Sequence, residues 1–168
     1  MTTTAQIVYS SEQTITCGID GLTSSTVTCR QSNVIDNTTS LFLDALLSVK
    51  LLVTSGTFAT IPYVNIWAYG AGVDGNYTDE ATGTDGTYTF PTTTLPTNLK
   101  LLQQVSFNVS TSTTLYAGPF SVASAFGGVL PDKWGIVLNN NTGATLDGTT
   151  GSQISNEASF IGLYVSNS

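Results

Sequence analysis

Short runs of alternating apolar and polar residues, separated by turn residues, recur along this chain. The clearest is Ile61–Tyr69, with the sequence IPYVNIWAY. Its two predicted faces hold Val64, Ile66 and Ala68 on one side and Asn65, Trp67 and Tyr69 on the other. A period of two residues is typical of a half-buried β-strand, and no segment sustains the 3.6-residue period of an amphipathic helix. The chain is therefore predicted to be all β.

Seven further segments are predicted to be strands, at residues 14–17, 25–29, 49–54, 101–110, 114–122, 134–138 and 159–165. The apolar run before residue 49 also allows a helical turn near Leu41–Leu47. Glycine, proline, asparagine and aspartate separate the strands, and the connections are too short for repeated βαβ crossovers. We expect an antiparallel β-sandwich of jelly-roll type.

The composition fits this prediction. Charged residues make up 9% of the chain, against ~25% in an average globular domain, and threonine and serine replace them. Threonine is β-branched and fits a half-buried sheet surface. At 168 residues the chain is long enough to bury one continuous core. We expect a single domain at residues 13–168, preceded by a polar, flexible arm at residues 1–12.

The charge balance argues against two classes of partner. The formal net charge is −7, and the four cations are Arg30, Lys50, Lys100 and Lys133. Nucleic acids and anionic membranes both attract clusters of basic side chains, which four scattered cations do not form. No apolar run approaches the ~20 residues of a membrane span, and no secretory signal is visible. We therefore expect a protein made in a cytoplasm and not exported by the general secretory route.

The residues offer little for catalysis. The chain has no histidine, which removes Ser-His-Asp and Cys-His arrangements and histidine-containing zinc sites. Glycoside hydrolysis needs only two carboxylates, but Glu12, Glu80 and Glu157 lie in the arm, in a loop and in a polar turn, and nothing pairs them. We predict that the protein is not an enzyme and has no cofactor.

Cysteine chemistry is limited to two residues, Cys17 and Cys29. For a cytoplasmic product we interpret them as buried, reduced thiols. They lie in two segments that can pair as neighbouring strands. A disulfide therefore remains an alternative, and the distance between the two cysteines decides it.

The longest predicted loop, residues 70–98, is rich in oxygen-bearing side chains, namely Asp74, Asn76, Asp79, Glu80 and Asp85. Oxygen ligands at short spacing suit calcium, but Asp79 stands where the EF-hand pattern requires glycine. We prefer to interpret these residues as Asp-Gly turn chemistry, with calcium binding as the alternative. A loop of this length is often functional, and short strands within it are compatible with the sequence.

Two further groups of residues admit a binding interpretation beside a structural one. The aromatic residues Trp67, Tyr69, Tyr77, Tyr88 and Trp134 suit a sugar-stacking platform, but alternating aromatics on strands are more often core or interface residues. The asparagines at 139–141 are predicted to stop a strand and reverse the chain together with Gly143. Glycosylation-type patterns at Asn37, Asn76, Asn108 and Asn140 are attributed to chance in a threonine-rich chain.

Three segments, taken in order, resemble a family of small virion proteins of tailed bacteriophages. They are IDNTTSLFLDALLSVKL, IPYVNIWAYGAGVDGNYTD and LPDKWGIVLNNNTGATL. The shared features are Asp-Asn-Thr before the first long strand, an Asp-Gly-x-Tyr loop, and a Pro-x-x-Trp-Gly strand followed by an Asn-x-x-Gly turn. The resemblance covers about residues 14 to 165 and points to head decoration or cement proteins.

This resemblance implies a jelly-roll domain that forms a homotrimer on the outer capsid surface of the virion and bridges neighbouring major capsid subunits. It implies no catalytic residue. The polar arm at residues 1–12 is a candidate capsid contact that orders on binding. The alternative is a β-sandwich module on a head fibre or tail that recognises host-surface glycans. Exposed aromatic residues beside Asp or Asn would favour that alternative, whereas aromatic residues buried at a threefold interface would favour the structural protein.

Overall fold

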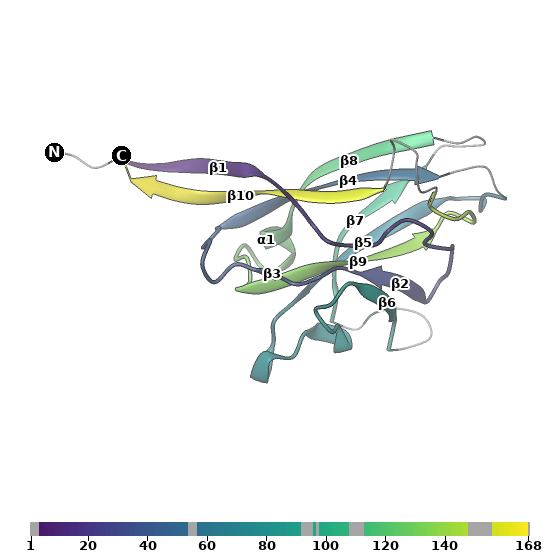
Figure 1. Cartoon of the computed structure of the whole chain (residues 1–168), viewed down its shortest axis with the longest axis horizontal. Helices are drawn as coiled ribbons and strands as arrows, with labels where there is room; N and C mark the ends of the chain where they lie inside the picture. Colours follow the sequence, from purple (N-terminus) through teal and green to yellow (C-terminus); the bar gives the residue numbers. More distant parts are fainter. Residues whose placement is uncertain are drawn as a thin grey trace.

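The computed structural model describes residues 4–53, 57–91, 96, 98–107, 113–147 and 156–167. These residues form two antiparallel sheets that pack face to face (Figure 1). Sheet A has the strand order β1-β10-β4-β8, and its strands are β1 (Ala5–Thr14), β4 (Asp44–Val53), β8 (Thr113–Ser121) and β10 (Glu157–Asn167). Sheet B has the order β6-β2-β9-β5-β7, with β3 also paired to β9. Its strands are β2 (Thr28–Gln31), β3 (Ile35–Asp36), β5 (Tyr63–Gly70), β6 (Gly86–Thr89), β7 (Lys100–Ser106) and β9 (Lys133–Asn141).

The predicted antiparallel sandwich is confirmed, and six of the predicted strands appear as β4, β5, β7, β8, β9 and β10 with shifted ends. The alternative of a helical turn at Leu41–Leu47 is wrong, because β4 begins at Asp44. The described part of the chain has short helical turns at η1 (Val73–Gly75), η2 (Thr78–Glu80) and α1 (Val122–Ala125). As the sequence allowed, the long loop contains one short strand, β6.

The strand predicted at residues 14–17 is not formed. Past Thr14 the chain leaves sheet A, and Ile15 and Ile19 insert into the core with 3% and 1% of their surface exposed. The alternation in this segment therefore reflects a loop that buries isoleucines rather than a strand. The strand predicted at residues 25–29 begins later, as β2 at Thr28.

The expectation of a flexible arm at residues 1–12 is corrected for the part that the structure describes. Ala5–Thr14 form β1, which pairs with β10 from Ala5 opposite Asn167 to Thr14 opposite Ser159, with a shift of register between Tyr9 and Glu12. The pairing uses the backbone, so the polar and mostly exposed side chains gave no sign of it. In Figure 1, β1 and the end of β10 run together away from the body of the sandwich. We call this projection, residues 5–11 and 161–167, the ribbon.

The main core lies between the sheets. Along β4 the residues alternate between buried and half-buried, and Leu47 and Leu51 are fully buried. Trp134 of β9 is fully buried and its ring meets that of Phe160 edge-on, with 5.3 Å between ring centres. Edge-on contacts of this kind add to the free energy that burial supplies. Sheet A and sheet B are thus joined through large apolar side chains on their facing sides.

Candidate functional site

The outer face of sheet B is covered over β2, β9 and the end of β5, whereas the edge strand β7 is mostly exposed. Four residues of the 70–99 segment pack there against three side chains of β2, β5 and β9 and form a second apolar cluster. The segment contributes Ala81, Tyr88, Phe90 and Leu99, and the three strands contribute Cys29, Tyr69 and Val137. A side chain at Gly135 would place its Cβ 2.3 Å from the Tyr69 ring, so glycine here leaves the space that the ring fills. The Tyr69 hydroxyl donates to the Ser32 carbonyl at 2.9 Å. Strand β9 is consequently buried on both of its faces.

Two of the loop carboxylates hold this cover in place. Asp79 accepts hydrogen bonds from the backbone amides of Asn98 (2.6 Å) and Leu99 (2.9 Å). Asp85 forms a two-point ion pair with Arg30, with both N···O distances at 2.7 Å. The hydrogen bonds from Arg30 hold the pKa of Asp85 below its usual value. Both carboxylates therefore have structural partners.

The calcium alternative finds no support in this geometry. Across the described ranges, no three acidic or cysteine side chains come together as metal ligands. Asp74 lies on the exposed turn η1, whereas Asp79 is buried. The loop therefore holds apart carboxylates that a calcium site would need around one ion. The preferred interpretation, turn chemistry, agrees with the left-handed backbone at Asp74 and Asp79.

The five aromatic residues considered for a sugar platform are structural. Tyr69 and Trp134 are fully buried, Tyr88 is 6% exposed, and Trp67 and Tyr77 pack against the second cluster. They meet one another or a phenylalanine edge-on, as Tyr69 and Tyr77 do with 5.4 Å between ring centres. The interpretation as core residues is confirmed for the three buried rings, and the half-buried rings of Trp67 and Tyr77 pack against the second cluster.

The three asparagines do not end their strand, which corrects that prediction. Strand β9 continues through Asn141, and the chain turns at residues 142–144 instead. Asn140 is fully buried: its amide group donates to the carbonyls of Leu22 and Ala144, both at 2.8 Å, and its side-chain oxygen accepts from Thr142. Because every polar atom of this side chain is satisfied, an amide is stable inside the core.

The sequence features that carry the virion resemblance also act structurally. Asp36 accepts from the Thr38 amide in a tight turn, and Asn37 exchanges two hydrogen bonds with the backbone of Phe42. Asn37 is 5% exposed and Asn140 is buried, so neither is a free acceptor for a glycan. Asn108 lies outside the described residues, and Asn76 is exposed.

The two cysteines are free thiols. Cys29 is buried in the second cluster and Cys17 is half-buried beside the main core. Burial raises the pKa of each thiol to about 12. A thiol that stays protonated near neutral pH is a poor nucleophile, so neither cysteine is suited to covalent catalysis.

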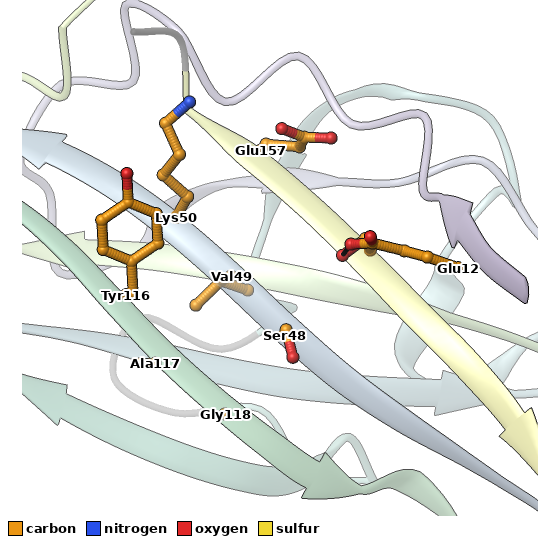
Figure 2. A pocket seen from close by; sticks show the side chains of 9 residues that line it. Glu12, Ser48, Val49, Lys50, Tyr116, Ala117, Gly118 and Glu157 are labelled. Atoms are coloured by element: carbon orange, nitrogen blue, oxygen red, sulfur yellow. Dashed lines mark hydrogen bonds between the residues drawn. The ribbon is translucent and has the colours of Figure 1, made fainter.

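In contrast to sheet B, the outer face of sheet A is open and carries a shallow hollow of about 320 Å³ (Figure 2). One row of side chains in the hollow crosses three neighbouring strands. It consists of Glu157 of β10, Lys50 of β4 and Tyr116 of β8, which are paired in register. Tyr116 is 74% exposed. The second row brings Ser159 opposite Ser48. Glu12 of β1 completes the rim and accepts a hydrogen bond from the Ser159 hydroxyl.

A β-bulge shapes the floor of this hollow. Leu47 pairs with Phe120 and Val49 with Ala117, which leaves Gly118 and Pro119 together opposite Ser48. Gly118 has a φ of 126°, and a Cβ at this position would lie 2.6 Å from the Leu47 carbonyl oxygen. Only glycine therefore fits where the two strands come together. Bulges that re-aim neighbouring side chains are common beside functional sites.

Farther along the same face, the ribbon is apolar and uncharged. Ile7 pairs with Val165 and Tyr9 with Leu163, all on the outer side. Ile7, Tyr9 and Val165 are 65%, 63% and 50% exposed. No charged residue occurs from Thr4 to Ser11 or from Ala158 to Asn167. Strand β1 is also the edge of sheet A, so its outer row of backbone groups pairs with no strand in the described part of the chain.

Sequence reasoning did not single out the hollow, and it placed residues 5–11 of the ribbon in a flexible arm that contacts the capsid rather than in a strand. Glu12 and Glu157 were considered as carboxylates without a partner, and the structure brings both to one hollow, while Glu80 lies on the long loop. Tyr116 alternates with Leu115 and Ala117, which pack against the core, and this alternation was the available signal that it faces outward. Pairing of β1 with β10 spans most of the chain length, which no local pattern reveals.

Comparisons of the chain with family models, with curated proteins and with solved structures find no match. They therefore neither support nor oppose the resemblance to virion proteins. Among the described residues, none of the helices is long and apolar enough to cross a membrane.

Proposed function

We propose that this protein is a structural virion protein of a tailed phage, a decoration or cement protein that binds the outer shell and stabilises contacts between major capsid subunits. The observation that carries this proposal is the apolar, uncharged ribbon at the open edge of sheet A. In this proposal the protein is not an enzyme, and it acts by burying surface against other protein subunits.

The strand pairing supports a jelly-roll fold, which the resemblance implies. With the short strands β3 and β6 set aside, β1 pairs with β10, β2 with β9, β4 with β8 and β5 with β7. The first strand thus pairs with the last, the second with the second-last, and so on inward. Wrapping such a long hairpin into two sheets also pairs β10 with β4 and β9 with β5, as is observed. A jelly roll of two interlocked Greek keys would have this pairing, so the strand order supports the proposal.

The ribbon has the properties of a surface that is covered in an assembly. An exposed sheet edge beside apolar side chains is a template for pairing with another chain, and proteins that remain free in solution commonly block such edges with charges or proline. The ribbon has neither between Thr4 and Ser11. Exposed contiguous apolar patches of several hundred Å² generally mark interaction sites.

A shell of identical subunits turns a modest contact into a stable one. We propose that the protein forms a homotrimer, so that three ribbons engage neighbouring major capsid subunits at once and avidity supplies the affinity. Its place in this account is the outer capsid surface of the virion, after synthesis in the cytoplasm of the bacterial host.

The test is a reconstruction of intact phage particles from cells that carry this sequence. We expect density for the sandwich on the outer capsid surface, with the ribbon in contact with a capsid subunit. Density on a tail or fibre alone, or particles that lack the chain, would contradict the proposal. Light scattering of the purified protein supplies a second check, because a stable monomer at high concentration would argue against the trimer.

The alternative, a module that recognises host-surface glycans, is favoured by one observation. An exposed aromatic residue, Tyr116, lies beside two carboxylates and an ammonium group in the hollow on sheet A. The two functions use different ends of the same face and are compatible in one protein.

A further inference from the structure

We propose that the hollow on the outer face of sheet A binds one neutral pyranose unit of a saccharide. Tyr116 supplies the ring that stacks on the sugar, and Glu12, Glu157 and Lys50 supply hydrogen bonds. This inference deepens the glycan-binding alternative by naming the site and the ligand class, and it does not depend on the capsid proposal.

The aromatic platform is the first element of the site. Tyr116 is 74% exposed although it lies in the middle of a strand. Figure 2 shows its ring at one rim of the hollow beside the Lys50 side chain, with Glu12 across β4 and β10 at the other rim. A tyrosine ring offers an apolar face together with a polar hydroxyl, which suits a sugar ring with its C–H face and its hydroxyl groups.

The second element is a set of unused hydrogen-bonding groups. Within the described ranges, the Lys50 ammonium, the Glu157 carboxylate and the Tyr116 hydroxyl have no protein partner, and Glu12 has a single bond to Ser159. Carboxylates accept hydrogen bonds from sugar hydroxyls, while an ammonium donates to hydroxyl and ring oxygens. The hollow therefore presents both kinds of group around one space.

Size and charge narrow the ligand class. The volume of about 320 Å³ is at the small end of the range of ligand sites, which fits one sugar unit rather than a long chain in a cleft. Two carboxylates and one ammonium give the hollow a formal charge of −1, in a chain whose net charge is −7. Sialylated, sulfated or phosphorylated sugars would be repelled, so the ligand is neutral.

The third element is a preformed floor. The bulge at Gly118 and Pro119 fixes the backbone on one side, and β10 and β4 pair without interruption on the other. A site that is already ordered avoids part of the entropy cost of binding. For a single sugar on a shallow face we expect a dissociation constant of roughly a millimolar.

The experiment uses the full chain and a panel of methyl glycosides of glucose, galactose and N-acetylglucosamine, with N-acetylneuraminic acid as the anionic comparison. Saturation-transfer NMR and titration should detect binding of at least one neutral sugar. Tyr116→Ala should weaken it by about tenfold, and Glu157→Gln should weaken it by a smaller factor. The matched control is Tyr9→Ala, which removes another largely exposed tyrosine, from the ribbon, and should leave sugar affinity unchanged.

Three results would overturn the inference: no binding of any neutral sugar at millimolar concentration, a preference for the anionic sugar, or an equal loss of affinity in Tyr9→Ala and Tyr116→Ala. Circular dichroism and the thermal midpoint of each variant show whether it is folded, and both tyrosines are exposed enough to be removed safely. A negative result for sugar binding would not affect the capsid proposal, because that proposal is tested separately by the binding of ribbon variants to phage particles.

Discussion

The outer faces of the two sheets differ in how much of their surface is buried. On sheet B, residues of the 70–99 segment cover β2, β9 and the end of β5 and add a second apolar cluster, so that β9 is buried on both sides. On sheet A, the outer side chains remain open, apolar on the ribbon and polar around the hollow. A face that is already buried contributes to stability but leaves little accessible surface for a partner to bind. The open face is therefore where we expect binding.

The second cluster should behave as a true core. Phe90 is 5% exposed and meets both Trp67 and Tyr88 edge-on. Phe90→Ala should lower the free energy of unfolding by about 3 to 5 kcal/mol, as expected for a buried phenylalanine. Tyr9→Ala on the open face should change it by less than about 0.5 kcal/mol. Urea unfolding of the two variants compares the faces directly, and similar losses in both would refute the contrast.

The buried amide of β9 should be the next most sensitive position. Asn140→Ala would remove one hydrogen bond from each of the Leu22 and Ala144 carbonyls and would leave the Thr142 amide without its partner, at a cost of about 2 to 3 kcal/mol. Its neighbour Asn141 is half-buried and its side chain bonds only to Asn139, so Asn141→Ala should cost less than about 1 kcal/mol. Chemical denaturation measures both, and a larger loss at Asn141 would show that the network is misassigned.

The ion pair between Arg30 and Asp85 should make the free energy of unfolding depend on pH. Hydrogen bonds from Arg30 lower the pKa of Asp85 in the folded protein. A carboxyl with a lowered folded pKa stabilises the fold above its unfolded pKa of about 3.9, and this stabilisation is lost as the pH falls through the folded value.

Asp85→Asn should accordingly cost about 1 kcal/mol at neutral pH, and its difference from the wild type should shrink towards about pH 2. Unfolding measured from about pH 6 to about pH 2 follows this change. The control is Asp74→Asn on the exposed turn η1, which should show almost no effect. A difference at Asp85 that does not depend on pH would mean that the ion pair is not its cause.

The smallest effect on stability should accompany the largest effect on association. Ile7→Asp places a charge on the ribbon and should change the free energy of unfolding by less than about 0.5 kcal/mol, because the side chain is 65% exposed. It should nevertheless reduce binding to phage particles by tenfold or more. Val73→Asp, at an 82% exposed apolar residue beside the covered face, is the matched control and should bind normally in a co-sedimentation assay.

The contrast between the faces also explains what the sequence could and could not predict. Alternation identified β5 because Val64, Ile66 and Ala68 face the main core from every second position of the strand. It failed for β1, because an edge strand held by backbone pairing needs no alternation. Turn propensity gave the wrong prediction for Asn139–Asn141, because the sequence does not distinguish an asparagine in a turn from one whose buried amide makes all its hydrogen bonds.

The candidate site was the least predictable part. Glu12, Lys50, Tyr116 and Glu157 are far apart in sequence and meet only through the register of four strands. By contrast, the acidic residues that are close in sequence, in the 70–98 loop, are directed to separate structural partners. Proximity along the chain was a poor guide to a site because long-range strand pairing decides which side chains share a face.

Hydrogen–deuterium exchange of the chain, free and bound to phage particles, tests the central claim most directly. If the open face is the binding face, the amides of residues 5–11 and 161–167 should gain protection on binding, while those of residues 77–90 should not change. Protection of residues 77–90 with none in the ribbon would contradict the account and would assign binding to the covered face instead.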